Sequence, residues 1–426
     1  MDVENIYHHF LEADGVTTDS RDVPENSIFF ALKGEHFNGN QYAGEAIKKG
    51  ASYAIVDEQE WANNNQCILV DNVLTTLQEL AHYHRQKMKA KIIAITGSNG
   101  KTTTKELAYS ILSSSFNVLT NIKNYNNHIG VPLTLLNLKS THEYGIIEMG
   151  ANHQGEIERL CRIADPEYGL ITNIGKAHLE GFGSFEGVKK AKGELYDYLS
   201  KKKGVVFYNR DNSILKDLVP ARDCKVISYG TNKNSTCKGE LTSIYPFLNI
   251  KYKDQIIQTR LIGKYNFENG LAAMCIGEYL GVPKEKIKHA VENYVPSNNR
   301  SQIIKTSHNK IILDAYNANP TSMQAAITTF KEIPGENKVL ILGDMFELGE
   351  YSKEEHSNMV KFLHKQSFER IFLVGKLFSS TSHQEYDAFQ TTEEFIEHLK
   401  AEPLKDKTIL IKGSRGMALE KVTAYL

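Results

Sequence analysis

Residues 96–104, with the sequence TGSNGKTTT, have the types and spacing of a loop that binds nucleotide phosphates. They follow an apolar run at 92–95, typical of a buried strand, and precede a helical pattern that begins at 105. In such a strand, turn and helix, backbone N–H groups and the positive helix end face an anion. Lys101 would reach the β- and γ-phosphates, and the Thr102 hydroxyl would bind Mg²⁺.

The turn departs from the full phosphate-loop pattern, because Ile95 stands where that pattern has its first glycine. A glycine turn that merely caps a helix is therefore the alternative interpretation. The preceding strand and the Lys-Thr pair favour a nucleotide site. We predict that the loop residues bind the phosphates, and these are Gly97, Ser98, Asn99, Gly100, Lys101, Thr102 and Thr103.

Two further candidates follow predicted strands. Glu148 comes after the apolar residues 144–147, and an acid at the end of a buried strand beside a phosphate loop can hold Mg²⁺ directly or through water. A helix cap or a solvated loop acid is the alternative. His178 comes after the apolar run 169–172. A lone histidine is more often a structural residue, but this position favours a role in the cleft.

Two other residues have a plainer default explanation. Lys192 belongs to a basic run with Lys189 and Lys190, and such a run is by default a solvated helix face. Asn269 lies at the start of an alanine-rich helix, where capping by asparagine is an equally good explanation. Spacing alone singles out neither Lys192 nor Asn269.

A second group of polar turns follows strands near the end of the chain, at 314–320, 343–349 and 412–416. The first of these turns is predicted to contact a ligand, although its Asn-Pro pair alone is also typical of the start of a helix. Charged residues at one edge of one sheet predict a second site, for a substrate with both charge signs. The candidate substrate-binding residues there are Tyr316, Asn317, Asp344 and Arg415.

Alternating strand and helix patterns must position these residues, and they predict an α/β fold of three domains. Residues 1–85 predict a small α/β domain. Residues 86–298 predict a central doubly wound domain around the phosphate loop, and after a break at 296–299 residues 299–426 predict a second doubly wound, Rossmann-like sheet. Ligands of such sheets bind at the carboxyl ends of the strands.

The composition is that of a globular protein of 426 residues, with 41% hydrophobic and 24% charged residues. A formal net charge of −1 gives no overall attraction to nucleic acid or to an anionic membrane. The five scattered cysteines suggest reduced thiols. The first residues lack the pattern of a signal peptide, and no uncharged apolar run is long enough to span a bilayer. We therefore expect a cytoplasmic enzyme that is a monomer.

Motifs along nearly the whole chain resemble those of the Mur ligase family. They are the Asp-Ser-Arg turn at 19–21, TGSNGKTTT, NYNNHIGVPLTLL at 124–136, IIEMGANHQGEI, ITNIGKAHLEGFGS, AKGE at 191–194, NFENGLAA, DAYNANPTSM, LGDMFELGE and KGSRG. Within the family, DAYNANP, LGDMFELGE and KGSR resemble the branch that adds a dipeptide. The DNPR segment of the branch that adds the third residue is absent from the sequence.

This resemblance implies that ATP and Mg²⁺ are the cofactors and that D-alanyl-D-alanine is joined to UDP-N-acetylmuramoyl-tripeptide. The first domain would hold the UDP-sugar, the central domain ATP, and the third domain the incoming amine. By motif, Glu148 would hold one magnesium and His178 a second, and Lys192 matches a lysine that is carbamylated in the family. The remaining residues implied are Asn269 and Arg300 for the adenine end and the phosphates, Asp314 for the ribose, and Ser20, Arg21 and Asn127 for the nucleotide-sugar.

Two segments depart from the family pattern. Asn38-Gly39-Asn40 stands where the family commonly has Asp-Gly-His, and Leu313-Asp314 replaces a pair of aspartates. The departures concern the sugar and ribose contacts, not the reaction class.

The expected chemistry is phosphorylation of the tripeptide carboxylate by ATP, followed by attack of the amine on the acyl phosphate. Charge on the transferred phosphoryl group would be offset by magnesium and Lys101. Two alternatives remain open at this point. One is another amino-acid-adding ligase, including a folylpolyglutamate-type synthetase. The other is a nucleotide-controlled binding protein without ligase chemistry.

Overall fold

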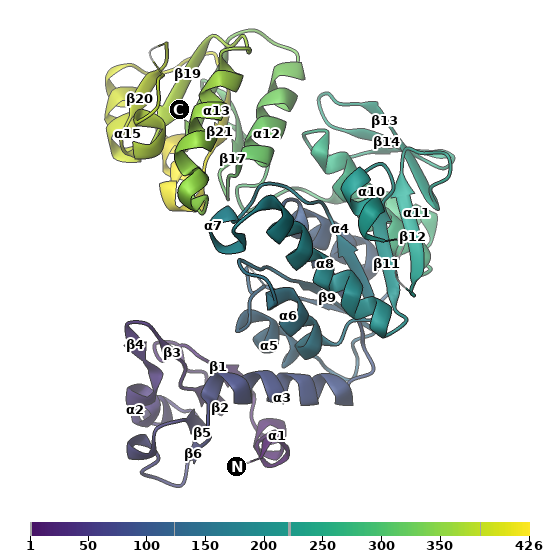
Figure 1. Cartoon of the computed structure of the whole chain (residues 1–426), viewed down its shortest axis with the longest axis vertical. Coiled ribbons are helices and arrows are strands. Elements are labelled where there is room, and N and C mark those ends of the chain that lie inside the picture. Colours follow the sequence, from purple (N-terminus) through teal and green to yellow (C-terminus); the bar gives the residue numbers. More distant parts are fainter. Residues whose placement is uncertain (1, 123, 220–222, 384) are drawn as a thin grey trace.

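The computed structural model describes residues 2–122, 124–219, 223–383 and 385–426. Three α/β domains follow one another along the chain, and Figure 1 shows the first at the bottom, joined to the central domain through the long helix α3. The predicted fold class is confirmed. No helix in these ranges is both long enough and apolar enough to cross a membrane.

The first domain contains a parallel four-stranded sheet in the order β1-β2-β5-β6. Helix α3 packs against α5 and α6 of the central domain, and it ends at Lys87, so the predicted boundary at 85 falls inside it. The elements are α1 (Val3–Glu12), β1 (Gly15–Thr17), β2 (Ser27–Phe30), β3 (Lys33–Gly34), β4 (Phe37–Asn38), α2 (Ala43–Lys48), β5 (Tyr53–Val56), β6 (Cys67–Leu69) and α3 (Val73–Lys87).

The central domain has a nine-stranded sheet in the order β15-β14-β13-β12-β11-β10-β7-β9-β8, antiparallel only among β13, β14 and β15. Its strands are β7 (Lys91–Thr96), β8 (Val118–Thr120), β9 (Tyr144–Glu148), β10 (Tyr168–Ile171), β11 (Val205–Asn209), β12 (Lys225–Gly230), β13 (Cys237–Ser243), β14 (Asn249–Tyr252) and β15 (Gln255–Gln258). Its helices are α4 (Lys101–Ser113), α5 (Gly130–Leu135), α6 (Glu156–Ala164), α7 (Leu179–Phe182), α8 (Phe185–Lys201), α9 (Ser213–Leu218), α10 (Tyr265–Tyr279) and α11 (Lys284–Asn293).

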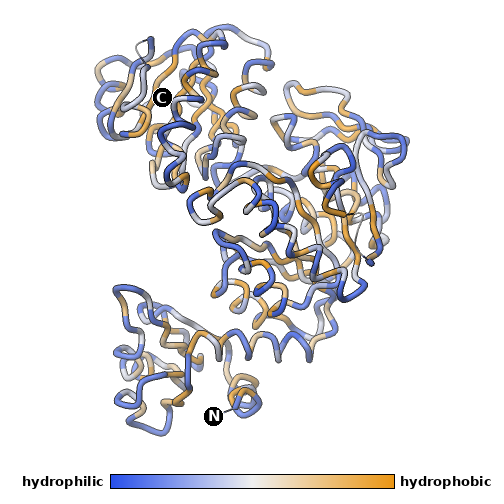
Figure 2. The backbone as a smooth tube through the Cα atoms, in the orientation of Figure 1, coloured by the Kyte–Doolittle hydropathy of each residue, from blue (hydrophilic) through white to orange (hydrophobic). Residues whose placement is uncertain are grey.

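Strand β7 anchors the phosphate loop at the carboxyl ends of the strands of this sheet. Its residues 92–95 are fully buried, and they alternate between two hydrophobic clusters on opposite faces of the sheet. Figure 2 shows the resulting hydrophobic interior. After β9 the chain crosses to β10 on the other side of β7, so the strand order reverses beside the loop. Such a switch point is where doubly wound sheets bind ligands.

The third domain has a six-stranded sheet in the order β16-β17-β21-β18-β19-β20, parallel except for β16. The strands are β16 (Gln302–Lys305), β17 (Lys310–Asp314), β18 (Lys338–Gly343), β19 (Arg370–Val374), β20 (Asp387–Phe389) and β21 (Thr408–Lys412). The helices are α12 (Pro320–Glu332), α13 (Ser352–Leu363), α14 (Lys376–Ser379) and α15 (Thr392–Ala401), with a 3-10 turn η3 (Gly349–Tyr351) before α13.

Candidate functional site

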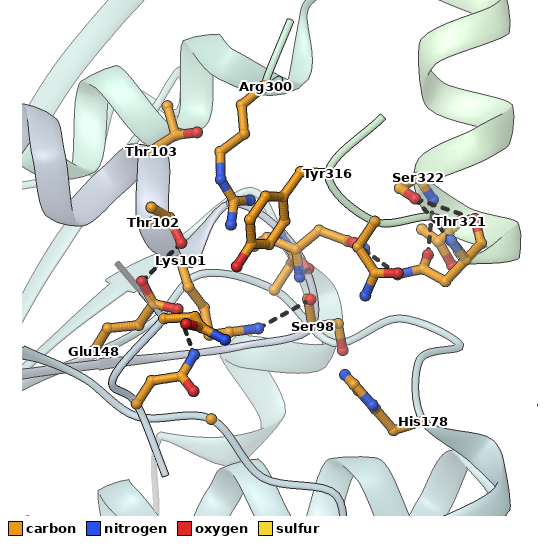
Figure 3. Close-up of a pocket in the computed structure, with 18 of the residues that line it drawn as sticks. Ser98, Lys101, Thr102, Thr103, Glu148, His178, Arg300, Tyr316, Thr321 and Ser322 are labelled. Atoms are coloured by element: carbon orange, nitrogen blue, oxygen red, sulfur yellow. Dashed lines mark hydrogen bonds between the residues drawn. The ribbon is translucent and has the colours of Figure 1, made fainter. Parts of the chain in front are cut away.

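A cavity of about 770 Å³ lies where the central and third domains meet. Figure 3 shows the phosphate loop on one side of it and the start of α12, with Thr321 and Ser322, on the other. Its walls come from the phosphate loop, the Asn124–Leu136 segment, the end of β9, the start of α10 and the turn after β17. The carboxyl ends of strands from two sheets thus face one cavity, which is large enough for a nucleotide and part of a second substrate.

The phosphate loop needs glycine at both of its tight positions. Gly97 has φ +142°, and a Cβ there would lie 2.0 Å from Thr172 Oγ1. Gly100 has φ +79°, and a Cβ there would lie 2.3 Å from Asn269 Oδ1. Because neither position has room for a side chain, glycine lets the loop pack closely on Thr172 and Asn269. The start of α4, which follows directly, offers free N–H groups to an anion.

Lys101 folds back over the loop. Its Nζ donates hydrogen bonds to Gly97 O at 2.7 Å and to Ser98 O at 3.2 Å. Desolvation lowers the pKa of the Lys101 ammonium. An ammonium that is desolvated and held by backbone carbonyls interacts strongly with phosphate oxygens, because the local dielectric is low.

The residues present fit a magnesium ion beside this loop. Thr102 Oγ1 donates to Glu148 Oε2 at 2.7 Å (Figure 3). Asn126 Nδ2 donates to Glu148 Oε1 at 2.8 Å. Glu148 is buried. A hydroxyl and a carboxylate are the oxygen donors that Mg²⁺ prefers, with phosphates completing its shell. No group of three or more His, Cys, Asp or Glu that could hold a metal is found within the described ranges, so Thr102 and Glu148 would need such phosphate ligands.

His178 lies across the cavity from Glu148, and Figure 3 shows its ring pointing toward the phosphate loop. Its Nδ1 is 2.6 Å from Glu347 Oε2 of the third domain, an ion-pair contact without the alignment of a hydrogen bond. This contact lowers the pKa of the Glu347 carboxyl. His178 and Glu347 are therefore brought together by the docking of two domains.

Lys192 corrects one expectation from sequence. It is 1% exposed, not part of a solvated face, and its Nζ donates to Ala151 O at 3.3 Å and lies over the Phe182 ring. Burial, and next the charge of Lys101, lower the pKa of Lys192 to about 7. The missed signal was helical spacing: Val188 and Tyr196, four residues on either side, are fully buried on the same face.

The third domain contributes a charged and aromatic wall. Asp314 Oδ2 pairs with Lys412 Nζ at 2.7 Å, and its Oδ1 accepts from the Ser301 backbone N–H at 3.1 Å. The Arg300 guanidinium lies 3.7 Å from the centre of the Tyr316 ring. Within the described ranges, Arg300 Nε is buried without a hydrogen-bond partner. A buried, unsatisfied donor of this kind fits an anionic ligand.

The structure gathers most of the predicted residues in this cavity, but not all. Ser20 and Arg21 lie in the first domain, where Arg21 is exposed and pairs with Asp19. Asp344 is buried, and its carboxylate accepts from the N–H groups of residues 377 and 378 at the start of α14. The predicted residues that line the cavity are Ser98, Asn99, Gly100, Lys101, Thr102, Thr103, Asn127, Glu148, His178, Asn269, Arg300, Asp314, Tyr316 and Asn317.

Asp344 therefore caps the start of α14 and is not among the cavity residues, because its carboxylate is occupied by these two backbone N–H groups. Arg415 is not among the cavity residues either, but its guanidinium lies 5.4 Å from the centre of the Tyr316 ring. Gly97 belongs to the loop without lining the cavity.

Sequence reasoning missed residues that hold the phosphate loop in place, from the third domain and from the central domain itself. Asn319 Nδ2 donates to Asn99 Oδ1 at 2.7 Å, which ties α12 to the phosphate loop. Asn173 binds the backbone of Asn99 through both its Oδ1 and its Nδ2. Glu347 lies within the LGDMFELGE motif, yet nothing in its local sequence distinguishes it from a solvated acid.

Comparison with known proteins identifies three family matches that follow one another along the chain. The Mur ligase family, catalytic domain, matches residues 12–96; the Mur ligase middle domain matches 95–277; and the Mur ligase, glutamate ligase domain, matches 299–415. The UDP-N-acetylmuramoyl-tripeptide--D-alanyl-D-alanine ligase of Bacillus subtilis is 35% identical over 97% of this chain and 93% of that relative.

Solved structures agree with these matches. MurF from Acinetobacter baumannii has a TM-score of 0.89 and 29% identity, covering 99% of this chain and 97% of that one. MurF ligase from Thermotoga maritima, solved in complex with ADP, has a TM-score of 0.86 and 26% identity, covering 98% of this chain and 97% of that one.

Proposed function

The chain belongs to the Mur ligase family, and we propose that it joins D-alanyl-D-alanine to UDP-N-acetylmuramoyl-tripeptide in the cytoplasm, with cleavage of ATP to ADP and phosphate through an acyl phosphate. The relative from Bacillus subtilis carries this name and is similar along almost the whole chain. One structural observation supports the proposal most directly. The phosphate loop and the turn after β17 face a single cavity, so a phosphoryl donor and an amine can meet there.

The reaction has two steps. A carboxylate oxygen of the tripeptide attacks the γ-phosphorus of ATP, the bond from that phosphorus to the bridging oxygen breaks, and ADP leaves. The amine nitrogen of D-alanyl-D-alanine then attacks the carbonyl carbon, loses a proton, and inorganic phosphate leaves. Exclusion of water from the acyl phosphate requires the domains to close around it.

The residues of the central domain would bind and orient the phosphates. Lys101 would leave its carbonyl partners for the β- and γ-phosphate oxygens, whose charge is larger. Thr102 and Glu148 would hold Mg²⁺, which supplies electrostatic stabilisation of the transferred phosphoryl group when bound. His178 and a carbamylated Lys192 would hold a second ion, because a carbamate offers anionic oxygens to a hard cation.

The other contacts follow from where the residues lie. We propose Asn269, Arg300 and Asp314 for the nucleotide, since all three line the cavity near the phosphate loop. The third domain, residues 299–426, would hold the dipeptide through Tyr316, Asn317 and Arg415. The first domain, residues 1–85, would hold the UDP-sugar through Ser20 and Arg21, with Asn127 of the central domain, residues 86–298, reaching toward it.

Release of ADP tests the proposal. The full-length protein should release ADP from ATP only when UDP-N-acetylmuramoyl-tripeptide and D-alanyl-D-alanine are both present. Release with L-glutamate in place of the dipeptide would favour a folylpolyglutamate-type activity. Nucleotide binding without any substrate-dependent release would favour a binding protein.

A further inference from the structure

The contact between His178 and Glu347 belongs to a small seam between two domains. On the central side it is formed by residues 178–183, which are His178 and helix α7 with the following glycine, and on the third-domain side by residues 347–351. We call this the α7 seam. The Glu180 N–H donates to Glu347 O at 3.3 Å, and the Tyr351 hydroxyl donates to Gly183 O at 3.2 Å.

The α7 seam is built for close approach. Gly349 has φ +54°, and a Cβ at this position would lie 3.1 Å from Glu180 Cα, Cβ and Cγ. A second link lies beside the seam, where Lys176 Nζ pairs with Glu355 Oε1 of α13 at 2.6 Å. The third domain is thus held against the segment that carries His178 by several independent contacts.

Both members of the central pair have an unfavourable backbone conformation. His178 has φ +53° and Glu347 has φ +62°, in the left-handed region that residues with a side chain rarely adopt. Such strain persists only where the surroundings hold it, and it gathers at functional sites. Two strained residues that face each other across a domain boundary indicate that the contact between them has a function.

The ring of a histidine has two nitrogens with separate roles. The negative charge of a carboxylate beside Nδ1 favours the proton on that nitrogen and restricts the ring, which leaves Nε2 for a cation. The carboxylate of Glu347 lies 2.6 Å from Nδ1, while His178 lines the cavity that contains Thr102 and Glu148. No other acidic side chain in the described ranges is in ion-pair contact with His178.

We propose that Glu347 is a positioning residue which orients His178 for a divalent cation, so that this cation site is complete only when the third domain is docked on the α7 seam. This inference rests on the proposed function for the role of the cation. It adds a physical link between domain closure and phosphoryl transfer, because an undocked third domain removes the carboxylate that aims the ring. ATP would then not be cleaved before the domain that binds the amine is docked.

Titration with Mn²⁺ in the presence of ADP, whose phosphates supply the additional ligands, followed by electron paramagnetic resonance of the full-length protein, tests the inference without substrate turnover. Glu347→Gln keeps the side-chain shape and should weaken Mn²⁺ binding by about 10- to 100-fold, the usual loss when a partner of a metal-bound histidine is removed. Glu350→Gln, an exposed acid in the same turn, is the matched control and should leave the affinity unchanged.

A third variant separates ring orientation from general loss of charge. Glu355→Gln removes the ion pair with Lys176 without touching His178, so it loosens docking and should also weaken Mn²⁺ binding, though less than Glu347→Gln. Unchanged Mn²⁺ affinity in Glu347→Gln, or no Mn²⁺ binding by the unaltered protein, would overturn the inference. The ADP-release assay judges the proposed function separately, since Mn²⁺ binding needs neither substrate.

Discussion

Substitution of alanine for Gly100 tests the geometry of the phosphate loop. The residue has φ +79°, where an L-amino acid with a Cβ costs about 1–2 kcal/mol. The new Cβ would also lie 2.3 Å from Asn269 Oδ1, so the Asn269 side chain must move. That movement gives up hydrogen bonds with Thr104 and Asn266, each contributing about 1 kcal/mol. The two effects together predict a loss of about 3 kcal/mol in the free energy of unfolding.

Gly270→Ala provides a matched control, because it adds the same methyl group next to Asn269. Its φ is not in the left-handed region, it lies inside helix α10, and the nearest atom to the new Cβ would be 3.4 Å away. Removing a glycine from a helix interior should stabilise the protein by up to about 1 kcal/mol. The two variants are therefore expected to differ by about 3–4 kcal/mol with opposite signs.

Urea unfolding followed by circular dichroism measures these changes, and titration with ADP measures the nucleotide site. Gly100→Ala should unfold at a lower urea concentration and bind ADP more weakly. In a double-mutant cycle with Asn269→Ala, the two losses should be less than additive, because the clash disappears with the Asn269 side chain. If Gly100→Ala proved as stable as Gly270→Ala, the strained, closely packed turn described here would be wrong.

Three further substitution and substrate tests follow from the site. Lys101→Ala should reduce the rate of ADP release by at least about 100-fold, because it removes about 3 kcal/mol or more of transition-state stabilisation. A variant that releases ADP at the wild-type rate would exclude contact between Lys101 and the phosphates. Lys192→Ala should lose most activity while Lys190→Ala, on the exposed part of α8, keeps it. Bicarbonate should activate the CO₂-depleted wild-type enzyme. This activation should fall as the pH drops through about 7, the pKa of Lys192, because only the neutral amine forms a carbamate. An active Lys192→Ala variant would refute a role for the Lys192 carbamate. The enzyme should prefer D-alanyl-D-alanine over single amino acids. Arg415→Ala should raise the KM for the dipeptide and not for the other substrates, because the guanidinium would bind the dipeptide carboxylate. An unchanged KM for the dipeptide would remove Arg415 from the site.

Local patterns in the sequence were sufficient to predict the elements that carry the site. The apolar run at 92–95 became β7, the glycine turn became the phosphate loop, and the alternation of strands and helices became three α/β domains. These features depend on neighbours within a few residues, so a single sequence contains the whole signal. The carboxyl ends of parallel strands then had to meet at one edge, which placed Glu148 beside Thr102.

Packing between distant segments decided the rest. Lys192 looked like part of a solvated basic run, but the docking of α8 on the central sheet buries it and lowers its pKa. Asp344 looked like a ligand for substrate, but the start of α14 folds over it. The contacts of Asn99 with Asn319 and of His178 with Glu347 join residues far apart in the chain. Burial and pairing of this kind depend on which faces meet when whole domains dock, and no short stretch of sequence carries that information.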